Sequence, residues 1–254
     1  MAQKVGSKKG AAGHGAESAT GARRKGAAEP AAELAAMVPG TVKCPKCGAP
    51  QAAAPVTVLR PDDGALGLLF QGTLNLFTCA ACGVRFKLEV ALLYRDDARR
   101  RIVYYVPPED APTPAAAEAQ VAAILQGCFG GGGAEKPECR LALSRQEFIE
   151  KIALLRAGLD DRLVEFIKYQ LYLRHEAAMD PRQRQLFYDF SLAGRDDLGF
   201  ILFDRATGKA QAGAHVPMAA YRELEDAWRS SAELKEEIGR LFPGFHVSAA
   251  TGFA

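Results

Sequence analysis

The sequence predicts an α+β protein: a zinc-ribbon-like β domain with a helical hairpin, followed by a C-terminal antiparallel strand meander and a helix. Three observations predict this class. Two CxxC pairs lie in a segment rich in strand-forming residues, a strongly capped helical stretch follows, and short apolar runs divided by turn residues precede a last helical pattern. With 48% hydrophobic and 24% charged residues over 254 positions, the composition is that of a globular chain.

Charge and cysteine content exclude several classes of protein. A net charge of +2 gives no overall support to nucleic-acid binding. Six cysteines are too few for a disulfide-stapled secreted scaffold, and the N-terminal residues carry charge without an apolar run, so we expect a cytoplasmic protein. The uncharged run 64–84 has transmembrane length, but its polar side chains and glycines argue against membrane insertion.

The first two segments differ sharply in composition. Residues 1–40 are rich in Ala and Gly and poor in larger apolar side chains, which predicts a disordered tail. Residues 41–108 are predicted to form the zinc-binding β part, with a hairpin tip at residues 94–98. The strands are expected over residues 51–60, 73–79, 84–94 and 101–106.

Residues 109–140 are predicted to form a flexible Pro/Gly linker. Within it, Thr113 as N-cap and Pro114 at the first helical position predict one short helix, which ends near Gly127. The glycine-rich run 129–136 lacks the Gly-Lys-Ser/Thr ending of a phosphate-binding loop, so we assign it to the linker as well.

Residues 141–180 are predicted to form the helical hairpin. Ser144 and Glu147 have the spacing of a capping box, and Gly158 suits a left-handed helix end. Asp160 or Asp161 would cap the second helix. The apolar stripe of the first helix consists of Phe148, Ile152, Leu155 and Leu159.

Residues 181–254 are predicted to form a C-terminal α+β segment. Apolar runs at 186–192, 199–204 and 210–215 are divided by turn residues, which favours an antiparallel meander. Residues 218–241 have helical apolar spacing and predict one long helix.

The two CxxC pairs carry the chemistry of this sequence. Cys44 with Cys47, and Cys79 with Cys82, each place two thiolates on one tight turn, and two such turns complete a tetrahedral site for one Zn²⁺. A glycine follows each pair and permits the positive φ of such a turn. Because four sulfurs leave no position for water or substrate, the site is expected to be structural.

Two alternatives use the same cysteines. An iron site with four thiolates has similar geometry, and a CxxC pair can be a dithiol redox centre. Cys128 and Cys139 have no CxxC partner or nearby histidine, so we predict that both are free thiols.

The sequence also resembles a known family. Residues 44–47, 71–82 and 92–96, together with the downstream patterns 104–107, 150–152 and 158–168, are similar to the bacterial CpXC-domain family, named for its paired CPxC motifs. The resemblance spans roughly residues 42–172 and departs at Ala80, where the motif has proline. It implies a zinc-ribbon-like site and supplies no reaction.

Other patterns are weaker. His175 and Glu176 begin like a zinc-protease motif, but Met179 stands where the second histidine is required. Asp160, Asp161 and Glu165 could form an acidic site, although the N-cap interpretation is favoured. Two clusters combine arginine with aromatic residues in the manner of nucleic-acid-binding surfaces: residues 99–101 with Tyr104 and Tyr105, and Arg182 and Arg184 with Phe187 and Tyr188.

These observations lead to a functional expectation. No catalytic residue and no cofactor other than the metal is predicted, because the sequence shows no convincing nucleophile, acid/base pair or phosphate loop. We therefore expect an interaction protein that binds a protein partner. A nucleic-acid-binding zinc ribbon is the second hypothesis, and an enzyme that uses residues assigned to structure is a third.

Overall fold

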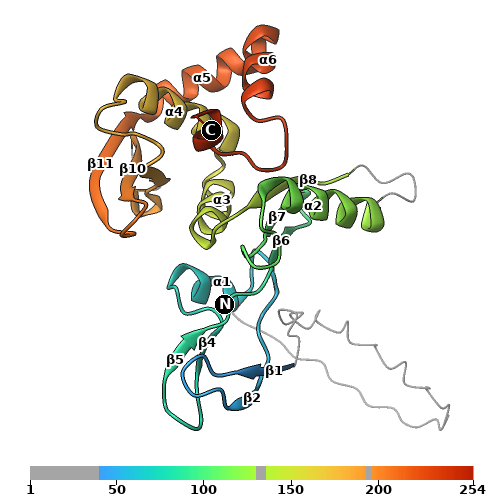
Figure 1. The fold of residues 1–254 in the computed structure, drawn as a ribbon. Helices are drawn as coiled ribbons and strands as arrows, with labels where there is room; N and C mark the ends of the chain where they lie inside the picture. The colour runs from blue at the N-terminus through green and yellow to red at the C-terminus, as the bar shows by residue number, and fades with distance from the viewer. Residues whose placement is uncertain (1–39, 130–135, 193–195, 254) are drawn as a thin grey trace, which may run out of the picture. The chain divides into compact units, whose positions relative to one another are not determined.

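The computed structural model describes residues 40–129, 136–192 and 196–253 (Figure 1). Contacts divide the chain into residues 1–33 and residues 34–254, and only the second unit contains described residues. The predicted disordered tail therefore lies outside them, apart from Gly40. Helices and several sheets confirm the α+β class. Among the described helices, none combines the length and apolar character that a bilayer-spanning helix needs.

Two small antiparallel ladders form what we call the ribbon: β1 (Gly40–Lys43) with β2 (Pro50–Ala53), and β4 (Leu76–Thr78) with β5 (Arg85–Lys87). The single strand expected over residues 51–60 is instead β2 and β3 (Val58–Leu59). Pro55 lies in the break, where it has no N–H to donate to a ladder. An unexpected helix, α1 (Gly64–Phe70), starts where the Asp63 side chain accepts from Ala65 N.

A four-stranded sheet has the order β3-β6-β7-β8. Strands β6 (Leu92–Asp96) and β7 (Arg101–Tyr105) form the expected antiparallel hairpin. Strand β8 (Glu138–Ala142) runs parallel to β7 and follows α2 (Pro114–Phe129). The linker expected over 109–140 thus contains a longer helix than predicted and part of a sheet strand; residues 130–135 lie outside the described ranges.

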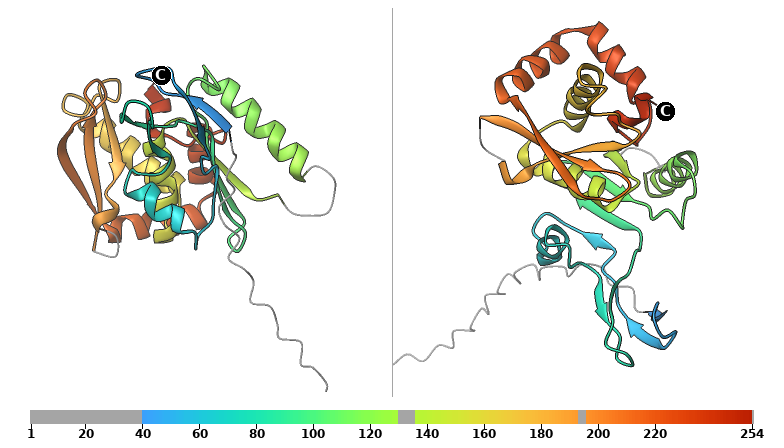
Figure 2. Two further views of the ribbon diagram at one scale, coloured as in Figure 1. Left: turned by 90° about the horizontal axis from the view of Figure 1, so that it is seen from below. Right: turned by 60° about the vertical axis from the view of Figure 1, so that its left-hand side comes forward.

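Both faces of this sheet are covered by helices. Ile102, Cys139 and Leu141 pack with α2 on one face, whereas Val103 and Tyr105 pack with α1 and α3 on the other. Figure 2 shows α2 and α3 on opposite sides of the sheet. The alternating burial along β8 is the reason this short segment is a strand and not a loop.

The helical hairpin consists of α3 (Arg145–Ala157) and α4 (Asp161–Arg174). Ser144 accepts from Glu147 N as predicted, but the Glu147 carboxylate accepts from Leu143 N at 2.8 Å and not from the cap residue itself. Gly158 has φ +71° at the end of α3, and Asp160 caps α4 by accepting from Arg162 N. Both turn predictions are therefore confirmed.

The C-terminal segment contains the expected meander. Strands β9 (Arg184–Tyr188), β10 (Asp197–Asp204) and β11 (Ala210–Pro217) are antiparallel in the order β11-β10-β9. The single helix expected after them is divided into α5 (Met218–Ser230) and α6 (Ala232–Leu241). Ser231 adopts extended backbone between them and caps α6 by accepting from Leu234 N. Two short 3₁₀ turns, η1 (Phe190–Leu192) and η2 (Ala249–Phe253), complete the segment.

The hairpin joins the C-terminal segment to the rest of the described fold. In α3, Phe148 and Ile152 belong to the cluster beneath the four-stranded sheet. The adjacent Ala153 and Leu154 belong to a second cluster, which includes side chains of α4 to α6 and β9 to β11. One helix therefore contributes to both cores.

Residues 242–253, which we call the C-terminal strap, are held by side chains of three helices. The Glu118 carboxylate accepts from Phe245 N and His246 N at 3.0 and 2.7 Å. Lys151 Nζ donates to Val247 O at 2.7 Å, and Ala249 N donates to Glu165 at 2.7 Å. Side chains of α2, α3 and α4 therefore satisfy the main chain of the strap.

The contact between Glu147 and His246 predicts acid sensitivity. Burial raises the pKa of Glu147, but the His246 ring at 3.3 Å, the Leu143 N–H and Lys151 outweigh it and lower the pKa from 4.5 to about 2. A lowered carboxyl pKa stabilises the fold above about pH 4.5, and this stability is lost as the pH falls toward 2. Glu147→Gln should therefore cost about 1–3 kcal/mol of unfolding free energy at pH 6 and much less at pH 2.5.

Urea unfolding at the two pH values measures this effect. Glu223→Gln, on the exposed side of α5, is the control and should change little at either pH. A Glu147→Gln penalty that stays constant from pH 6 to 2.5 would contradict the assignment.

Candidate metal centre

The structure brings the four predicted cysteines together. The sulfur atoms of Cys44, Cys47, Cys79 and Cys82 all lie within 4.8 Å of one another. Two of the separations, both 3.7 Å, join Cys44 to Cys82 and Cys47 to Cys79. Cys44 and Cys79 are buried, whereas Cys47 is exposed. This cluster is compatible with metal binding.

The two cysteine turns repeat one local geometry. In the first, Gly48 N donates to Cys44 O and Cys44 N donates to Ala49 O; in the second, Gly83 N donates to Cys79 O and Cys79 N to Val84 O. Gly48 and Gly83 both have φ +71°, a value that L side chains rarely adopt. The glycine after each CxxC pair therefore has the conformational role that the sequence predicts.

The sulfur spacing fits a tetrahedral, thiophilic ion. Four ligands at about 2.3 Å from a central zinc are about 3.8 Å apart, close to the 3.7 Å observed. A disulfide would need about 2.05 Å between sulfurs, and the two pairs at 3.7 Å join different CxxC motifs. An all-sulfur set does not suit Mg²⁺ or Ca²⁺, which prefer oxygen ligands. The residues present therefore fit zinc.

Hydrogen bonds, burial and neighbouring sulfurs move the pKa values of these thiols in opposite directions. Burial raises the pKa of the Cys44 thiol, but the N–H groups of Cys47 and Lys46 outweigh it and lower the pKa to about 6. At Cys82 the N–H of Val84 lowers the pKa, but burial and the neighbouring sulfurs raise it to about 12. Four crowded sulfurs cannot all ionise near neutral pH unless a bound cation compensates their repulsion.

The ribbon lacks an apolar core of its own. The three clusters of buried hydrophobic side chains among the described residues contain no residue of β1, β2, β4 or β5. The group of four sulfurs lies between its two ladders, together with a hydrogen bond from Ala80 N to Gln51 Oε1. A metal at this position would therefore replace a hydrophobic core.

Two polar side chains that the sequence analysis missed position the cysteine turns. Asn75, at φ +59°, accepts from Val56 N and donates to Val56 O, so it ties β4 to the segment after β2. Gln51 Oε1 accepts from Ala80 N at 3.2 Å, a bond that proline at position 80 could not donate. An asparagine within a strand-like run was the available signal for the role of Asn75. Nothing in the local sequence indicated the role of Gln51.

The residues of the weaker candidate sites lie at helix ends, in the core or in buried ion pairs. His175 is exposed at the end of α4 and belongs to no metal-type cluster of His, Cys, Asp or Glu among the described residues. Burial raises the pKa of Cys139 to about 12, so this thiol stays protonated; the Cys128 side chain lies outside the described residues. Asp160 is an N-cap, and Asp161 and Glu165 are in buried ion pairs.

The two arginine and aromatic clusters are partly neutralised. Arg99 pairs with Asp96 at 2.8 Å in the turn between β6 and β7. Arg184 donates to the main chain at Ala178, and Phe187 packs against Phe203 with 5.7 Å between ring centroids.

Comparisons with known proteins bear on the cysteine region. A family model described as CpXC protein matches residues 42–168, half of the chain, from β1 to within α4. No curated protein matches the chain, and no solved structure matches it.

Proposed function

We propose that this chain, which belongs to the CpXC protein family, is a zinc-binding interaction protein. In this proposal Cys44, Cys47, Cys79 and Cys82 hold one structural Zn²⁺, and the ordered ribbon binds a protein partner. The observation that carries the proposal is the convergence of four sulfurs within 4.8 Å of one another.

A structural role follows from the ligand count. Catalytic zinc keeps a position for water or substrate, and four thiolates fill all four positions of a tetrahedral ion. A site of four thiolates requires reduced cysteines, and this supports a cytoplasmic location.

An aromatic pair on the ribbon supports partner binding. Phe77 of β4 lies opposite Phe86 of β5, with 6.3 Å between ring centroids. Both side chains are partly exposed and belong to none of the buried clusters among the described residues. Aromatic residues are enriched in protein interfaces, so this pair is the surface we assign to the partner.

Metal content tests the zinc site. Full-length protein purified under reducing conditions should contain one zinc and no iron per chain. Cys44→Ser combined with Cys82→Ser should remove the metal, whereas Cys139→Ser, which changes a buried cysteine elsewhere, should keep it. Iron, or equal zinc in both variants, would overturn the assignment.

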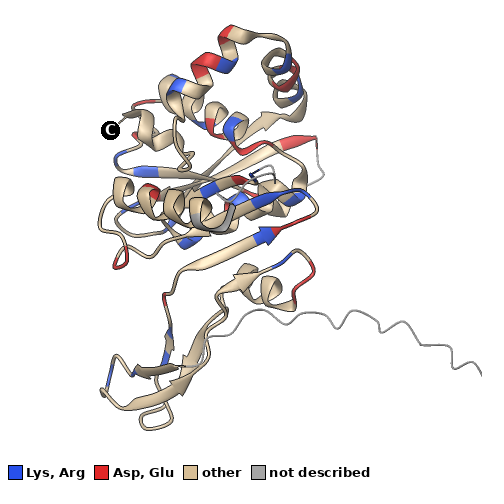
Figure 3. Ribbon diagram, turned by 90° about the vertical axis from the view of Figure 1, so that its right-hand side faces the viewer, with Lys and Arg blue, Asp and Glu red and all other residues tan. Residues whose placement is uncertain are grey.

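Charge on the ribbon favours nucleic acid as a second candidate ligand. Lys43, Lys46, Arg85 and Lys87 are exposed around the cysteine turns, and residues 40–60 and 71–88 contain no Asp or Glu. Figure 3 shows the Lys and Arg positions of the ribbon in blue. A Zn²⁺ ion bound by four thiolates has a net charge of −2. The four basic side chains outweigh it, so a net positive charge remains near the site. Binding to single-stranded DNA that weakens steeply between 50 and 200 mM salt would support this candidate, and absent or salt-insensitive binding would exclude it.

A further inference from the structure

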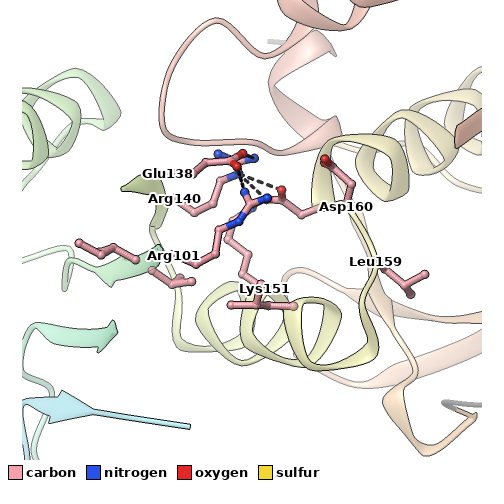
Figure 4. A pocket seen from close by; sticks show the side chains of 10 residues that line it. Arg101, Glu138, Arg140, Lys151, Leu159 and Asp160 are labelled. Atoms are coloured by element: carbon pink, nitrogen blue, oxygen red, sulfur yellow. Dashed lines mark hydrogen bonds and ion pairs between the residues drawn. The ribbon is translucent and has the colours of Figure 1, made fainter. Parts of the chain in front are cut away.

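Away from the cysteines, one carboxylate lies among three arginines. Glu138 at the start of β8 forms ion pairs with Arg101 of β7, Arg140 of β8 and Arg162 of α4, the last at 3.1 Å. The Arg140 side chain is only 11% exposed, and the Glu138 side chain is 30% exposed. Figure 4 shows Arg101, Glu138 and Arg140 around one cavity.

Further charges surround this group. Asp161 accepts from Arg140 at 2.8 Å and from Lys151 at 3.1 Å. Asp160 pairs with Arg162 at 3.1 Å. Four cations therefore face three carboxylates, which leaves one positive charge in excess.

Open space adjoins the arginines on two sides. A cavity of about 50 Å³ is lined by Arg101, Glu138, Arg140 and Lys151. A larger groove of about 950 Å³ shares Glu138 and Arg140 with it and is also lined by Arg162. Glu138 thus lies where the small cavity and the groove meet.

Guanidinium groups of this arrangement suit a phosphoryl group. Planar arginine forks bind carboxylate and phosphate oxygens through paired hydrogen bonds, and several arginines around one anion make a strong site. A phosphate dianion carries more negative charge than the Glu138 carboxylate, so it would compensate the excess positive charge better.

We propose that Arg101, Arg140 and Arg162 form a binding site for a phosphate-bearing small molecule. Its phosphoryl group takes the place of the Glu138 carboxylate, which turns toward the groove, and the remainder of the ligand lies in that groove. The Glu138 side chain acts as an internal substitute when the ligand is absent. This site is independent of the proposed zinc centre.

The decisive variant is Glu138→Gln in the full, zinc-loaded chain. If Glu138 competes with the ligand, removing its charge should tighten inorganic phosphate binding by about tenfold in calorimetry, which corresponds to about 1.4 kcal/mol. Phosphate should also raise the melting temperature of the variant more than chloride does at equal ionic strength. If the ion pairs only stabilise the fold, Glu138→Gln should be destabilised, and phosphate should raise its melting temperature no more than chloride does.

The matched control is Glu89→Gln, which removes a carboxylate that pairs with one arginine, Arg145, at 3.1 Å. Phosphate and chloride should affect this variant equally. Wild-type chain and Arg162→Gln provide a second measurement that does not depend on the folding of Glu138→Gln: phosphate binding to wild type should be weak and should disappear in Arg162→Gln. No phosphate-specific effect in wild type or in Glu138→Gln would overturn the proposal.

Discussion

Metal removal is expected to unfold the ribbon and leave the rest of the described fold in place. Structural zinc contributes about 10–16 kcal/mol in small metal-dependent domains, and the ribbon has no buried apolar cluster to replace it. The four-stranded sheet and the hairpin, in contrast, have cores that contain none of the four cysteines. Loss of the metal should therefore act locally.

Hydrogen exchange measured by mass spectrometry tests this expectation. After chelation, amides in residues 40–53 and 76–88 should lose protection, while α3, α4 and the meander retain it. Returning zinc should restore protection in wild type but not in Cys44→Ser/Cys82→Ser. Unchanged exchange of the ribbon in verified metal-free protein would show that its fold does not depend on the metal.

Lys168→Met should be among the most destabilising single substitutions. The Lys168 side chain is 2% exposed and donates to Glu150 at 2.6 Å and to Glu165 at 2.7 Å. Removing it leaves two carboxylates buried without their cation, which typically costs about 3–5 kcal/mol.

The penalty should depend on pH. In wild type, burial raises the pKa of Glu150, the Lys168 ammonium lowers it and Glu165 raises it, so that it is about 7. This folded-state pKa is above the ordinary 4.5. The contribution of the Glu150 carboxyl to the stability of the fold is therefore complete below about pH 4.5 and is lost as the pH rises through 7. Without the Lys168 ammonium, which lowers the pKa of Glu150, the buried Glu150 carboxyl opposes ionisation more strongly, so the penalty should be larger at pH 8 than at pH 5.

Guanidinium unfolding of Lys168→Met at both pH values checks this expectation. Lys209→Met, an exposed lysine after β10, is the control and should have little effect. Adding Glu150→Gln and Glu165→Gln to Lys168→Met should recover part of the lost stability, because the unpaired charges are then removed. A penalty below 1 kcal/mol at pH 8 would mean that the network is not buried in solution.

The parts that sequence predicts well are governed by neighbouring residues. CxxC spacing and the following Gly48 and Gly83 predict both cysteine turns, because a tight turn depends on a few adjacent residues. Ser144 and Gly158 likewise mark the two ends of α3. The alternating apolar runs predict the meander of β9 to β11.

Most of the misses have non-local causes, and one has a local cause. Strand β8 lies in a segment whose sequence predicts a linker. It is part of a sheet because it pairs with β7 and packs under α2, and neither contact is visible in the local sequence. The helix expected over 218–241 divides at Ser231, where a local cap competes successfully with a continuing apolar pattern. Asn75 and Gln51 bond to residues far away in the chain, so their roles are invisible in a local window.

The sequence by itself determined the four-cysteine cluster, the caps of α3 and α4 and the α+β class, because spacing, backbone propensity and apolar periodicity are local properties. Only the tertiary structure decided which charges meet. The His246 ring contacts Glu147, which lies 99 positions away in the sequence. Glu138 forms ion pairs with three arginines, one each from β7, β8 and α4. Burial makes such contacts energetically important, and burial depends on how distant segments pack together.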